Sequence, residues 1–73
     1  MNWRDHILSD PQILHGKPCI QGTRIPVALV LGYLAAGRDT AAIQHEFPGL
    51  TVADVAACLD HARELAEFEA VPA

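Results

Sequence analysis

The sequence predicts a mostly α-helical domain, in which three helices form a helix-turn-helix-like bundle behind a short extended or β arm. Three observations carry this prediction. Residues 27–36 form a charge-free apolar run that ends at a glycine. A Pro-Gly pair at residues 48–49 separates two further segments with helical patterning. Each of those two segments begins at a side chain that caps helices.

The length of the chain fixes the domain organisation. With 73 residues and 7.9 kDa we expect one domain over residues 1–73, divided into an arm over 1–26 and a three-helix core over 27–70. A domain this small buries about 60% of its surface and usually needs a disulfide, a metal or a partner chain for stability. The same length excludes a Rossmann fold or a (β/α)₈ barrel.

The arm is predicted to hold two short extended segments, at residues 18–20 and 23–25, joined by a turn at residues 21–22. An earlier turn is expected at residues 10–11, because the residue before a proline is pushed out of the α region. Gly16 is expected at a positive φ. Together these signals indicate a small ribbon ahead of the helices.

The first predicted helix covers residues 27–36. Pro26 fits the first turn of a helix, and Gly37 is a typical residue just past the end of one. The helix has no charged residue, whereas a surface helix normally has a polar face. We predict that one side of it meets another chain; the alternative is that the arm and the third helix cover it. The candidate contact residues are Leu29, Leu31 and Tyr33.

The second and third predicted helices cover residues 40–47 and 52–69. Asp39 or Thr40 caps the second helix. Thr51 begins the third with the pattern of a capping box, with aspartate in the place usually held by Glu or Gln. Two helices joined by a short turn behind a leading helix make the trihelical arrangement of homeodomain-like and winged-helix-like domains.

The third predicted helix has two adjoining apolar stripes, more than a small domain needs to bury. The primary stripe consists of Val52, Val55, Ala56, Leu59, Ala62 and Ala66. The second stripe consists of Cys58, Leu65 and Phe68. We predict that this second stripe contributes to a partner or dimer interface, with ordinary core packing as the alternative.

Charge is divided unevenly along the chain, whose net charge is −4. Residues 1–38 carry four basic and two acidic side chains, and residues 39–73 carry one basic and seven acidic side chains. Lys17, Thr23 and Arg24 in the arm are therefore the candidate phosphate contacts for a nucleic acid. The start of the third helix has no Arg, Lys, Asn or Gln for reading bases, and its aspartate opposes phosphate.

No metal, cofactor or catalytic group is predicted. Four zinc-compatible side chains occur, but their order matches no recognised zinc signature; they are His15, Cys19, Cys58 and His61. The chain has no Gly-rich phosphate loop and one serine, so we expect no enzyme activity. Two cysteines are too few for a secreted disulfide framework, and no signal peptide or membrane span is visible, so we expect a cytoplasmic protein.

Residues 10–27, with the sequence DPQILHGKPCIQGTRIPV, resemble the signature of the domain of unknown function 433 (DUF433) family. Two later elements fit the same pattern: LAAG at residues 34–37 and FPGLT at residues 47–51. The similarity covers about residues 7–66. Within the signature, Gly22, Ile25 and Pro26 match residues whose role is structural, with a tight turn at Gly22 and a helix start at Pro26.

The resemblance implies a helix-turn-helix-like fold in small bacterial proteins, many of which look like VapB-type antitoxins encoded beside a PIN-like ribonuclease toxin. It carries over no catalytic residue. We therefore expect an antitoxin-like homodimer, or a higher homo-oligomer, that neutralises such a toxin and binds operator DNA. Two alternatives stay open: a stand-alone DNA-binding transcriptional regulator, and a protein-interaction module with no nucleic-acid role.

Overall fold

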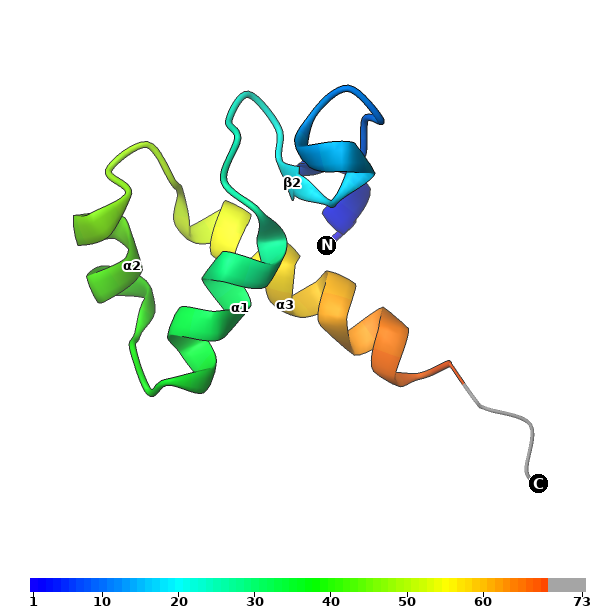
Figure 1. Cartoon of the computed structure of the whole chain (residues 1–73). Helices are drawn as coiled ribbons and strands as arrows, with labels where there is room; N and C mark the ends of the chain where they lie inside the picture. Colours follow the sequence, from blue (N-terminus) through cyan, green and yellow to red (C-terminus); the bar gives the residue numbers. More distant parts are fainter. Residues whose placement is uncertain (69–73) are drawn as a thin grey trace.

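Three α-helices and a two-stranded sheet make up the fold in the computed structural model, which describes residues 1–68 (Figure 1). The helices are α1 (Val27–Ala35), α2 (Thr40–Glu46) and α3 (Val52–Ala66). The arm contains the strands β1 (Ile7–Leu8) and β2 (Cys19–Ile20) and the short 3₁₀ helices η1 (Trp3–Asp5) and η2 (Leu14–Gly16). The predicted trihelical fold behind a short β arm is thus confirmed.

The longest helix, α3, packs against α1 and the arm, and α2 packs against α1. Figure 1 shows α1 crossing α3, with α2 on one side and the arm on the other, while the last turns of α3 project away from the rest. The arm packs on α3 chiefly through η1. Helix α1 contacts both α2 and α3. None of the helices in residues 1–68 has the length and apolar character needed to cross a membrane.

The helix boundaries follow the predicted signals. Asp39 caps α2 by accepting a hydrogen bond from a backbone N–H of the first turn, and Gly37 after α1 has φ of 88°. Thr51 and Asp54 form the complete capping box of α3, with each side chain accepting from the backbone N–H of the other. The helix ends at Ala66, three residues before the predicted end at 69, which lies outside the described residues.

The arm pairs differently from the prediction. Residues 19–20 pair antiparallel with residues 7–8, in the register Ile7 to Ile20 and Leu8 to Cys19. No strand forms at 23–25, because the Thr23 hydroxyl donates to the Ile20 carbonyl and accepts from the Ile25 N–H, which closes a turn. The predicted ribbon is present in part, since the Ile20 N–H donates to the Ile25 carbonyl and Cys19 forms an isolated antiparallel bridge with Pro26. The additional pairing of β2 with β1 buries the side chains of both Ile7 and Ile20 in the core.

The core of the described residues is aliphatic and contains no buried polar residue. Its members are Ile7, Cys19, Ile20, Val27, Val30, Ile43, Leu50, Val55, Ala57 and Cys58. The predicted primary stripe of α3 is only partly confirmed: Val55 is buried in the core, whereas Val52 and Leu59 are 63% and 49% exposed. The helix is turned so that Glu64 and Asp54 meet the arm, where Trp3 and His6 are their hydrogen-bond partners.

Gly22 is expected to contribute to the stability of the fold through its backbone conformation alone. Its φ is 78°, and a Cβ added there would meet no atom within 4 Å. Gly22→Ala should therefore lower the free energy of unfolding by about 1–2 kcal/mol, the cost of a left-handed L-residue. Urea unfolding measures it, with Gly32→Ala as the control: that glycine lies inside α1, is also uncrowded, and should gain stability on substitution. Equal effects of the two changes would contradict the conformational explanation.

Candidate functional site

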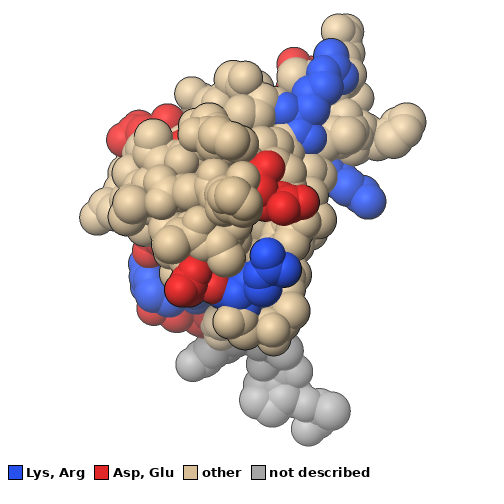
Figure 2. All heavy atoms as spheres, turned by 90° about the vertical axis from the view of Figure 1, so that its left-hand side faces the viewer, with Lys and Arg blue, Asp and Glu red and all other residues tan. Residues whose placement is uncertain are grey.

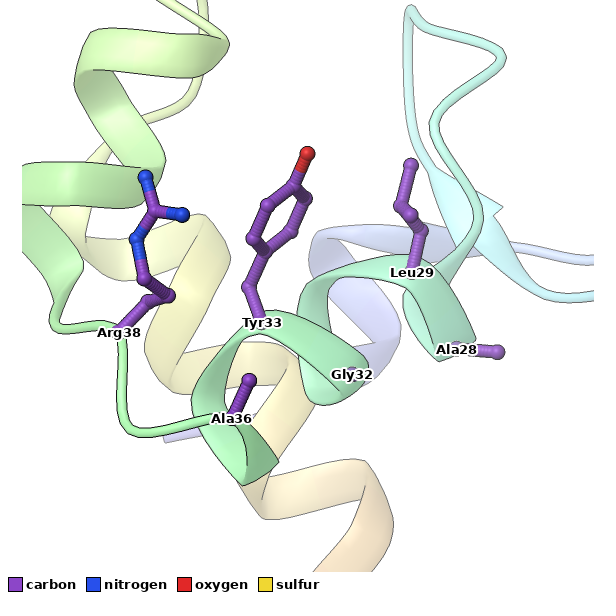
Figure 3. A pocket seen from close by; sticks show the side chains of 6 residues that line it. All are labelled: Ala28, Leu29, Gly32, Tyr33, Ala36 and Arg38. Atoms are coloured by element: carbon purple, nitrogen blue, oxygen red, sulfur yellow. The ribbon is translucent and has the colours of Figure 1, made fainter.

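The outer face of α1 forms a shallow, almost uncharged groove. Ala28, Leu29, Gly32 and Ala36 are exposed along it, and Leu29 alone is 43% exposed. Together with Tyr33 and Arg38 these residues line a hollow of about 360 Å³. Figure 3 shows Leu29, Tyr33 and Arg38 projecting in the same direction, with the Arg38 guanidinium beside the ring of Tyr33 at 5.5 Å.

Two further hollows continue this groove toward the end of α3. The first, of about 270 Å³, lies between Lys17, the start of α1 and Leu65, and shares Ala28 with the groove. The second, of about 450 Å³, extends from Trp3 to Phe68 and shares His61 and Leu65 with the first. We call this continuous region the α1–α3 surface; its apolar part is made of Ala28, Leu29, Leu31, Tyr33, Leu65 and Phe68.

The structure brings five of the six predicted contact residues together on the α1–α3 surface. They are Leu29, Leu31, Tyr33, Leu65 and Phe68. Leu65 and Phe68 are 65% and 82% exposed, so their apolar side chains have little cover within residues 1–68. The sixth, Cys58, was assigned wrongly: it is fully buried in the core, because its position on α3 faces α1 and the arm rather than solvent.

The arm forms one wall of this surface and is fastened to α3 by polar contacts. The Trp3 indole donates to the Glu64 carboxylate at 2.6 Å, and its ring meets the His61 ring edge to face at 4.5 Å. Arg4 forms an ion pair with the same carboxylate at 2.7 Å. The hydrogen bond from Arg4, and then that from Trp3, lower the pKa of Glu64 and keep it charged. These contacts fix the position of η1.

A second fastening joins the arm to the start of α3. The His6 ring lies 3.0 Å from the Asp54 carboxylate, which also caps the helix. Burial raises the pKa of Asp54, but the hydrogen bond from the Thr51 N–H, and after it those involving His6 and the Thr51 hydroxyl, outweigh burial and bring the pKa below its usual value. Asp54 therefore acts as a carboxylate that joins the arm to the helix.

The predicted phosphate contacts are only partly available. Lys17 and Arg24 are exposed, and among residues 1–68 neither forms an ion pair. Thr23 uses its hydroxyl inside the turn, which makes it a structural residue here. On the face in Figure 2 the basic side chains stand at separate places, with uncharged and acidic surface between them, so this face has no continuous basic patch.

The one arginine of α3, Arg63, is not available for a phosphate site. Arg63 is held by Asp60 and Glu67 on its own helix, which neutralise it locally. The first exposed residue of α3, Val52, has no hydrogen-bonding side chain. The helix that would enter a DNA groove in a helix-turn-helix therefore presents an apolar and acidic surface.

The four zinc-compatible side chains are not assembled into a site. Within residues 1–68 no group of three or more His, Cys, Asp or Glu side chains could hold a metal ion. Cys19 and Cys58 are both free and buried. Burial, with a smaller contribution from Asp54, raises the pKa of the Cys58 thiol to about 11, so the reactive thiolate is scarce at neutral pH.

Several residues of the α1–α3 surface were not predicted from the sequence. The spacing of Ala28, Gly32 and Ala36 at every fourth position was a usable signal, because it puts three small residues on one helix face. Trp3 and Glu64 had no such signal, since their contact joins positions 61 residues apart.

Comparison with known proteins agrees with the fold and leaves the activity open. A family model described as "Protein of unknown function (DUF433)" matches residues 7–62. A crystal structure of a DUF433 member protein from Anabaena variabilis is similar to this chain, with 28% identity and a TM-score of 0.80. The similarity covers 88% of this chain and 63% of that one, so this chain spans less than two thirds of the other protein. No curated protein matches the sequence.

Proposed function

This chain belongs to the DUF433 family, and we propose that it is an antitoxin-like protein that binds and neutralises a PIN-like ribonuclease toxin without catalysis of its own. One observation carries the proposal: the α1–α3 surface exposes a contiguous set of apolar side chains in a chain of 73 residues. Contiguous exposed apolar surface of this kind is typical of protein-binding sites. The resemblance of residues 10–27 to the family signature supplies the class of partner.

DNA binding and self-association belong to the same proposal as secondary roles. A cytoplasmic homodimer would double the number of exposed basic groups at Lys17 and Arg24, and a higher homo-oligomer would multiply it further. Either would strengthen contact with operator phosphates. The chemistry of α3 favours protein binding over a stand-alone DNA-reading role, because the exposed start of that helix lacks base-reading side chains.

Co-expression with the product of the neighbouring gene, which the proposal requires to be a PIN-like nuclease, tests the main proposal. We expect a complex that survives affinity purification through a tag on the nuclease, and loss of ribonuclease activity as this protein is titrated in. Nuclease expressed alone is the control and should stop growth. A nuclease that stays active and purifies without this chain would refute the antitoxin role. A gel shift with the gene's own promoter at two salt concentrations measures the DNA role separately.

A further inference from the structure

We infer that the α1–α3 surface binds an amphipathic protein segment that presents aliphatic side chains together with carboxylates. The inference rests on the proposed function and deepens it, because it names the chemistry that a protein partner must bring to this surface. Two independent observations carry it: the shape and apolar character of the surface, and the unpaired positive charges along it.

The apolar observation concerns both helices. Leu65 and Phe68 stand exposed at one end of the surface and Leu29 at the other. Between the exposed groups, α1 presents Ala28 and Gly32, and a Cβ added at Gly32 would meet no atom within 4 Å. Small residues on a helix let the backbone of another segment approach closely. Aliphatic side chains of a partner can therefore fill the hollows on both sides of Ala28.

The electrostatic observation concerns Lys17 and Arg38. Arg38 lines one of the two hollows that share Ala28, and Lys17 lines the other. Among residues 1–68 neither cation forms an ion pair, whereas Arg4 at the far end is paired with Glu64. The charged residues lining the three hollows are Lys17, Arg38, Arg4, Glu64 and Glu67, which gives the surface a net +1 in a chain of net −4. A partner with carboxylates at its edges would complement it.

A second copy of the chain fits this surface less well than an acidic segment does. A two-fold interface brings the same patch of both subunits together. The carboxylates that each copy carries on this surface, Glu64 and Glu67, are already paired with Arg4 and Arg63. A two-fold interface would therefore bring together two copies of Lys17 and Arg38 without supplying a free carboxylate for them. Phosphate is also a poor occupant, because the positive groups are separated by apolar side chains rather than gathered around one point.

Two synthetic helical peptides of equal length provide the test. Both peptides have leucine and alanine at the same positions. At the remaining positions one peptide has glutamate (the Glu peptide) and the other has lysine (the Lys peptide). Fluorescence anisotropy with the full chain should show that the Glu peptide binds about tenfold more tightly at low salt, and that the difference shrinks at high salt. Equal affinities, tighter binding of the Lys peptide, or no binding of either would overturn the inference.

Matched variants locate the binding. Leu65→Glu should weaken binding of the Glu peptide at least about tenfold, while Leu59→Glu, an exposed leucine on another face of the same helix, should not. Lys17→Glu with Arg38→Glu should remove the preference for the Glu peptide, and Arg24→Glu, an exposed unpaired cation outside the surface, should keep it. Circular dichroism checks that each variant is folded, and Leu65→Ala replaces Leu65→Glu if that variant is not.

Self-association is the competing outcome. Sedimentation equilibrium of the wild type, Leu65→Glu and Leu59→Glu shows whether a dimer depends on this surface, and a dimer lost only with Leu65→Glu would overturn the inference. The inference and the proposed function can fail separately. A nuclease complex lost with Leu59→Glu but not with Leu65→Glu would leave the antitoxin role and refute this surface. Binding of the Glu peptide without any nuclease complex would support this surface and refute the antitoxin role.

Discussion

Ile43→Ala is expected to lower the free energy of unfolding by about 2–5 kcal/mol, the usual cost of emptying an isoleucine site in a packed core. Ile43 is completely buried and is the only buried residue of α2. A helix of seven residues has little stability of its own, so α2 depends on this contact. Because a domain this small has only about 3–5 kcal/mol of core stability to lose, a large unfolded population is expected at 25 °C.

Urea unfolding followed by circular dichroism measures this effect. Leu59→Ala is the matched control, since it removes an aliphatic side chain that is 49% exposed and should cost far less. If Ile43→Ala does not fold at all, Ile43→Val provides a graded version with an expected loss of about 0.5–1.5 kcal/mol. A loss from Ile43→Ala as small as that of the control would mean that α2 is held by something other than this side chain.

Asp54→Asn is expected to lower the free energy of unfolding by about 1–2 kcal/mol at pH 7, the typical range for a lost helix cap. The change weakens the bond from the Thr51 N–H and removes the charge that faces His6. It should also alter the response to pH. The pKa of Asp54 is lower in the folded protein than its usual value of about 3.9, so the stabilisation is complete above that pH and is lost as the pH falls through the folded value.

Urea unfolding between pH 7 and about pH 3 gives the measurement, and the acid-induced loss of stability should be smaller in Asp54→Asn than in the wild type. Glu64 contributes to the loss in both proteins, because Arg4 lowers its pKa as well. Asp5→Asn, an exposed aspartate on η1, is the control and should follow the wild type. Parallel pH curves for Asp54→Asn and the wild type would show that this carboxylate does not link the arm to α3.

The candidate site was predictable only in its apolar members. Leu29, Leu31, Tyr33, Leu65 and Phe68 stood out because their helices carry more apolar residues than a small domain can bury. The arm's contribution was not predictable, because Trp3 reaches Glu64 across most of the chain. Cys58 was wrongly predicted to lie at an interface for a related reason. An apolar stripe on a helix does not determine which face of the helix packs against the core.

What the sequence determined by itself was local: the starts of the three helices, the cap at Asp39, the capping box at Thr51 and Asp54, and the left-handed glycine after α1. These features depend on backbone conformation and hydrogen bonds within a few residues. The tertiary structure alone decided the rotation of α3, because Asp54 and Glu64 lie against the arm, whose His6 and Trp3 are their hydrogen-bond partners. Contacts between distant residues also joined the apolar residues of α1 and those at the end of α3 into one surface with the arm as a wall, which no local pattern encodes.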